Sequence, residues 1–96
     1  MKEQQKRNII LESWKMHAEV EAAYLQQPAA QGDKGWPEKQ QLLLADMALH
    51  LLQTALAPNA LDKDKLKNNL NAIMTISDEY LPHAELKKAA DKLYQE

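Results

Sequence analysis

The chain of 96 residues contains no cysteine and no phenylalanine, and it has only two glycines. The absence of cysteine excludes a disulfide scaffold, a thiolate zinc site and thiol catalysis. It also fits a cytoplasmic setting, which is the location that we expect. No glycine-rich phosphate-binding loop is present. The remaining composition, 45% apolar and 27% charged, is typical of a globular domain.

Long apolar runs are also missing from the sequence. The longest, Leu42 to Leu56, is shorter than the ~20 residues needed to cross a bilayer, and Asp46 and His50 interrupt it. No apolar region follows the basic N-terminal residues, so we expect no signal peptide. The net charge is −2, and acidic and basic residues are balanced in both halves. We therefore expect neither a transmembrane segment nor nucleic-acid binding.

Apolar residues recur at spacings of three and four, a pattern that predicts helices and no strands. Pro28 ends the first predicted helix, and Pro37 suits the first turn of the second. Asp62 is a good N-cap for the third, while Pro82 disfavours helical geometry at the residue before it. We predict one all-α domain over residues 1–96, a small four-helix bundle. The predicted helices cover about residues 3–27, 37–57, 62–81 and 82–95.

The second predicted helix is the most apolar segment, because eleven of the fifteen residues from Leu42 to Leu56 are apolar. At ~100° per residue, Asp46, His50 and Gln53 form one narrow stripe, and apolar side chains cover roughly 240° of the circumference. A helix of an antiparallel bundle shows its neighbours little more than ~100°. The excess predicts a helix that is either surrounded by the other three or covered on one flank by a second chain. We favour the second arrangement, as a two-fold homodimer.

The flank covered by a second chain has two candidates on this helix. One contains Leu44, Met47, Leu51 and Ala55, and the other contains Leu49 and Leu56. Trp36 precedes Pro37 in the expected loop, where it either folds over the apolar end of the helix as a lid or contacts a partner. The predicted partner-binding residues are Trp36, Leu44, Met47 and Leu51.

The core is expected to be built from leucine, isoleucine, alanine and methionine, with aromatic anchors. Burial against neighbouring helices is the expectation for Trp14, Tyr24 and Tyr80. Leu52 and Leu70 are placed on inward faces by the helical spacing.

The candidate chemistry rests on Asp46 and His50, which lie four residues apart on one helix. An aspartate at this spacing can orient a histidine as a general base or support it as a metal ligand. However, HExxH and Glu-x-x-His motifs are absent, and no nucleophile motif surrounds a serine. His17, His50 and His83 lie on three helices, but their spacing does not require a shared metal. We therefore predict no catalytic, cofactor-binding or metal-binding residues.

In its length, lack of cysteine and four-helix pattern, the chain resembles the small cytosolic immunity proteins that accompany pediocin-like bacteriocins. The resemblance is one of shape, so no residue role is taken from it. Our main hypothesis is a non-catalytic protein-interaction domain that binds a protein partner or itself. A bacteriocin-immunity-like protein is the first alternative. The second is a small enzyme or ligand-binding bundle that uses Asp46 and His50, with His17 as a candidate third member, around a pocket between helices.

Overall fold

The computed structural model describes residues 1–95, and over this range the chain forms four α-helices and no strand. This confirms the predicted all-α, four-helix architecture. None of the helices within residues 1–95 is long and apolar enough to span a membrane. The helices are α1 (Glu3–Gln26), α2 (Trp36–Leu56), α3 (Lys63–Asp78) and α4 (Leu86–Lys92), and a short 3-10 helix, η1 (Pro82–Ala84), precedes α4.

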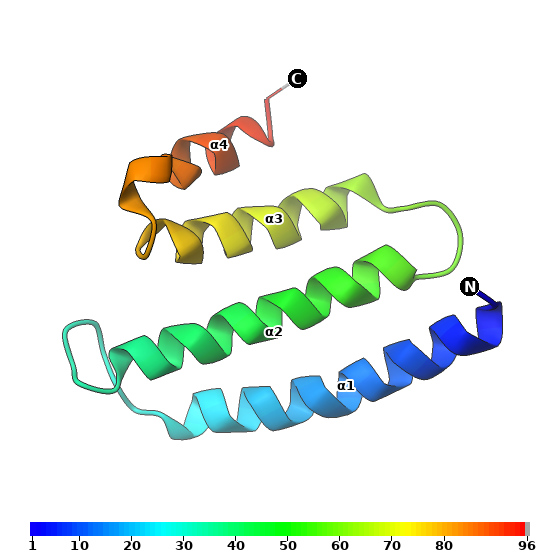
Figure 1. Ribbon diagram of the computed structural model, residues 1–96, viewed down its shortest axis with the longest axis horizontal. Helices are drawn as coiled ribbons and strands as arrows, with labels where there is room; N and C mark the ends of the chain where they lie inside the picture. The colour runs from blue at the N-terminus through cyan, green and yellow to red at the C-terminus, as the bar shows by residue number, and fades with distance from the viewer. Residues whose placement is uncertain (96) are drawn as a thin grey trace.

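The helices lie side by side in chain order, each antiparallel to the one before it (Figure 1). α1 packs on α2, α2 on α3 and α3 on α4. The molecule measures 44 × 37 × 16 Å. Viewed down the shortest of these axes, the four helices lie next to one another and none covers another, so they form one layer (Figure 1). α2 is therefore central, with α1 along one flank and α3 along the other.

The third helix begins where the sequence predicts. One carboxylate oxygen of Asp62 accepts hydrogen bonds from the backbone N–H groups of Asp64, at 3.0 Å, and Lys65, at 3.1 Å. These donors have no partner inside the helix, so the side chain satisfies two groups that would otherwise depend on water.

Replacement of Asp62 by alanine is expected to lower the free energy of unfolding by about 1 kcal/mol, because both cap hydrogen bonds are lost. Urea denaturation followed by circular dichroism measures the effect. Lys63→Ala, an exposed change one residue further along, is the control and should stay within about 0.5 kcal/mol of wild type. A midpoint unchanged by Asp62→Ala would show that this cap does not stabilise α3.

The C-terminal part of the chain differs from the prediction. α3 ends at Asp78 instead of near residue 81, and the expected helix over 82–95 is divided into η1 and the seven-residue α4. Two backbone positions explain the division. Leu81, before Pro82, has φ −129° and ψ 58°, and Glu85 has a left-handed φ of 54°. Neither conformation continues a helix, and the first follows from the steric clash between proline and the preceding residue.

The single layer buries few side chains. Five residues in the range 1–95 are buried, at 8% exposure or less: Ser13, Ala29, Gln40, Ile76 and Ala90.

Several expected core residues are in fact accessible. The expectation that Trp14 and Tyr80 would be buried is wrong, because each is about half exposed. Tyr24, Leu52 and Leu70 are partly buried. The physical reason is geometric: a helix in one layer covers its neighbours' flanks but not their upper and lower faces. The helical spacing identifies the apolar stripes, but it does not show how many layers cover them.

Candidate functional site

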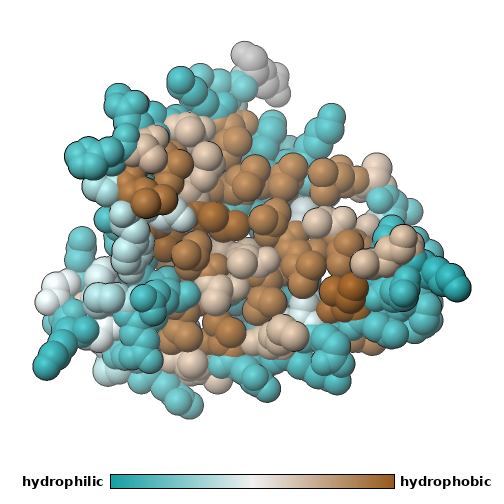
Figure 2. Space-filling model, viewed as in Figure 1, coloured by the Kyte–Doolittle hydropathy of each residue, from teal (hydrophilic) through white to brown (hydrophobic). Residues whose placement is uncertain are grey.

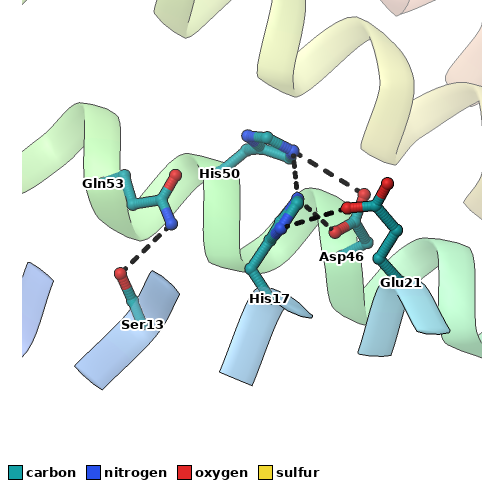
Figure 3. A network of polar contacts seen from close by, with 6 residues as sticks. All are labelled: Ser13, His17, Glu21, Asp46, His50 and Gln53. Atoms are coloured by element: carbon teal, nitrogen blue, oxygen red, sulfur yellow. Dashed lines mark hydrogen bonds and ion pairs between the residues drawn. The ribbon is translucent and has the colours of Figure 1, made fainter. Parts of the chain in front are cut away.

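The contact between α1 and α2 is built around a small residue. Ser13 on α1 is almost completely buried, and its hydroxyl donates to the carbonyl of Ile10 at 2.6 Å. The same hydroxyl accepts a hydrogen bond from Gln53 Nε2 on α2 at 3.2 Å (Figure 3). The short side chain lets the two helices approach closely. As a result, the next turn of α1 places His17 against the polar stripe of α2.

Three polar side chains meet at this point: His17 from α1, and Asp46 and His50 from α2 (Figure 3). His17 Nε2 lies 2.8 Å from Asp46 Oδ1 and 3.1 Å from His50 Nε2. His50 Nε2 lies 3.6 Å from Asp46 Oδ2. The side chains of His17 and Asp46 are 14% and 15% exposed, and that of His50 is 34% exposed. We call these three residues the His17–Asp46–His50 cluster.

The shortest contact of the cluster is not a hydrogen bond. Asp46 Oδ1 is buried and has no hydrogen-bond partner, although His17 Nε2 is only 2.8 Å away. A hydrogen bond requires the N–H to point at the acceptor as well as a short distance. The ring nitrogen and the carboxylate oxygen are therefore close together without facing each other in the way that a donor and an acceptor do.

Two side chains that do not belong to the cluster also contact the His17 ring. Its second ring nitrogen, Nδ1, lies 3.5 Å from a carboxylate oxygen of Glu21, one turn further along α1. The Trp14 ring packs edge-on against the His17 ring, with centroids 5.4 Å apart. His17 and His50 are also edge-on, at 4.7 Å. The His17 ring is thus fixed on several sides.

The cluster opens into a shallow groove of about 370 Å³ between α1 and α2. The apolar side chains Tyr24, Leu25 and Leu43 line it beside the cluster. A second, larger hollow of about 690 Å³ also reaches His50 and continues toward α3, past Trp14 and Asn69. Neither is an enclosed cavity, so solvent and small ligands reach the edge of the cluster at His50, while His17 and Asp46 lie deeper.

The cluster lies on the face of the layer that Figures 1 and 2 do not show. In Figure 1, α1 runs from right to left below α2; in Figure 3, it runs from left to right, from Ser13 to Glu21, with α3 again above α2. The two pictures therefore view opposite faces. We call the face with Asp46, His50 and Gln53 the polar face.

The other face is apolar. Leu52 follows His50 by two residues on α2. This spacing places the two side chains about 200° apart around the helix, so Leu52 points away from the polar face. It lines a hollow between α1 and α2 together with Ile9 and Met16. Figure 2 shows hydrophobic residues across the middle of this face, with hydrophilic residues at its rim. We call this surface, which includes Ile9, Met16 and Leu52, the apolar face.

The predicted partner-binding residues fall at two places. Leu44, Met47 and Leu51 are partly buried on the flank of α2 that also carries Thr54, whose hydroxyl donates to Asn69 of α3 at 2.7 Å. This flank therefore turns toward α3. Trp36 is the first residue of α2, instead of a loop residue, and is partly buried. A partner contact at these four residues stays a prediction.

The structure brings together the three residues that the sequence suggested for an interhelical pocket. Asp46 and His50 share one helix face as expected, and His17 joins them, while His83 is exposed in η1. The contact of Glu21 with His17 and the close approach of His17 to Asp46 were not predicted. One signal was available: His17 lies on the inward stripe of its own helix, where a polar side chain needs a polar partner.

The chain was compared with models of protein families, with curated proteins and with solved structures, and none of them matches it. The layer of helices and the cluster are therefore the features that bear on its function.

Proposed function

We propose that this protein is a non-catalytic interaction module that associates with a second copy of itself through the apolar face. The single layer of helices is the observation that carries the proposal. Domains are stable when two layers enclose a core between them. A single layer leaves its apolar face in contact with water. A second layer packed on that face would exclude the water from it.

The exposed surface area shows how much more of this chain is in water than in a compact monomer of the same mass. The chain exposes 7002 Å² at a mass of 11.0 kDa. A folded monomer of that mass exposes about 5,600 Å², so the excess is about 1,400 Å². The radius of gyration, 15.1 Å, is likewise larger than the about 12.5 Å of a globular chain of this length. The surface area and the radius of gyration both indicate that the chain leaves exposed an area as large as a protein–protein interface.

A second copy supplies cover of the required size. If each chain buries its excess, the pair buries about 2,800 Å² in total, which lies within the roughly 2,000–5,000 Å² of obligate homodimers. Two-fold pairing places the same surface on both sides, so one apolar face completes the other. The hydrophilic rim in Figure 2 fits the usual anatomy of such an interface, with an apolar centre and a polar edge.

Light scattering coupled to gel filtration, at micromolar concentration of the purified chain, tests the proposal. We expect a mass of about 22 kDa, twice the chain mass of 11.0 kDa, because the second layer comes from a second copy. A mass of 11 kDa with high helicity and a cooperative unfolding transition would overturn self-association. A chain that is monomeric and poorly folded alone would also contradict it, and would favour a different protein as the cover.

The two alternatives from the sequence are supported to different extents. The groove beside the His17–Asp46–His50 cluster is a specific observation in favour of a ligand-binding protein, since it exposes convergent polar groups between apolar walls. The likeness to bacteriocin immunity proteins has no such support and stays a prediction.

A further inference from the structure

We propose that His17, Asp46 and His50 form a binding site for a divalent transition-metal ion, with Zn²⁺ as the best-matched ion. The site lies on the polar face, so it is independent of the association through the apolar face. Two imidazole nitrogens and one carboxylate oxygen are a donor set that Zn²⁺ accepts, with a position left for water or a ligand.

The spacing of the donor atoms is the first argument. Zinc–nitrogen and zinc–oxygen bonds of about 2.0–2.1 Å at tetrahedral angles place neighbouring donors about 3.3 Å apart. The three contacts of the cluster are 2.8, 3.1 and 3.6 Å, on both sides of this value. One donor atom from each residue can be chosen so that all three lie within 4.8 Å of one another. The contacts to the two histidines come from different oxygens of Asp46, so a small rotation of its carboxylate is needed to bring one donor atom of each residue to bonding distance around one ion.

The orientation of the groups is the second argument. A hydrogen-bonded network does not satisfy the cluster, because the buried Asp46 Oδ1 has no hydrogen-bond partner. A metal ion between the three side chains would satisfy it, since the ion accepts electron pairs from the carboxylate and from both Nε2 atoms together. Buried polar atoms are rarely left without a partner, and a cation held between the three side chains would give this oxygen one.

The surroundings of His17 are the third argument. Coordination through Nε2 requires the proton of the neutral ring to be on Nδ1. The Glu21 carboxylate lies 3.5 Å from Nδ1. After a small movement of its side chain, it can accept a hydrogen bond from the Nδ1–H group. Such a carboxylate behind a histidine ligand is the usual second partner in zinc sites, where it fixes the ring and strengthens the ligand. Glu21 is thus a positioning residue.

Charge also favours a cation. Asp46 and Glu21 carry two negative charges, and the ion-pair partners that the structure gives them within residues 1–95 are the two histidines. A neutral imidazole does not balance a carboxylate. A divalent ion neutralises both acidic groups while both histidines remain uncharged.

Calorimetric titration of the full-length, tag-free chain with ZnCl₂ in a non-chelating buffer tests the site. We expect one Zn²⁺ per chain. His50→Ala and Asp46→Asn should each weaken binding at least ~100-fold, since each removes a direct ligand, and Glu21→Gln should weaken it about 10-fold. His83→Ala is the matched control, because it removes a histidine outside the cluster and should leave the affinity unchanged.

The result is decided by comparison of the variants. Absence of Zn²⁺ binding at 100-fold excess over protein, or binding that His50→Ala and Asp46→Asn leave unchanged, would overturn the site. Circular dichroism checks that each variant is folded. Should the substitutions unfold the chain, Co²⁺ bound to the wild type decides: intense visible absorption that Zn²⁺ abolishes supports a tetrahedral site, and the weak absorption of hydrated Co²⁺ contradicts it.

Discussion

Substitution of Leu52 by glutamate is expected to dissociate the proposed dimer. Leu52 lies on the apolar face, beside Ile9 and Met16. Two-fold pairing buries two copies of this position, and a buried carboxylate without a partner costs several kcal/mol. The dissociation constant should rise at least ~100-fold, or about 2.7 kcal/mol. Sedimentation equilibrium of wild type and variant at equal concentrations measures the change.

The matched control for Leu52→Glu is the same substitution at another leucine. Leu11 is 60% exposed on α1, five residues from Met16 and therefore about 140° away from it around the helix. Leu11→Glu adds the same charge without placing it on the apolar face, and the dimer should persist. Equal dissociation by the two variants, or none by Leu52→Glu, would show that the apolar face is not the interface.

Truncation of Ile76 to alanine is expected to lower the free energy of unfolding by about 2–5 kcal/mol. Ile76 is only 8% exposed and is the largest side chain in the small buried apolar set, which otherwise consists of alanines. With so few buried groups, little surrounding structure can close the resulting cavity. Denaturant unfolding at a fixed protein concentration measures the loss, because the stability of a dimer depends on concentration.

Leu11→Ala is the control for this second substitution, since a leucine that is mostly in water should lose less than about 0.5 kcal/mol when truncated. Similar losses for Ile76→Ala and Leu11→Ala would mean that the buried position on α3 contributes no more than the surface does. In that case the stability of the chain would have to come from elsewhere.

The helices were largely predictable because their signals are local. Prolines end α1 and begin α2, and the Asp62 side chain caps α3, so these boundaries follow from residues within one turn. The end of α3 was not predicted correctly. The apolar stripe continues through Tyr80, whereas the helix stops at Asp78. Backbone geometry near Pro82 outweighs side-chain periodicity there.

The arrangement of the helices and the cluster was harder to predict. The apolar circumference of α2 indicated that it needs neighbours on several sides, but a stripe on one helix does not identify the element that covers it. Asp46 and His50 were recognised together because a single helix carries both. Their meeting with His17 depends on the register between α1 and α2, which the contact at Ser13 sets across a sequence separation of 40 residues.

The order of the helices in space, identical to their order in the chain, has a consequence for how the protein folds. Each helix docks on the one synthesised just before it, so the main helix contacts close only short loops, and proteins of this kind form their native contacts rapidly. If a second copy completes the core, the slow step is the encounter of two chains. Refolding would then be a second-order process, and dilution would delay it.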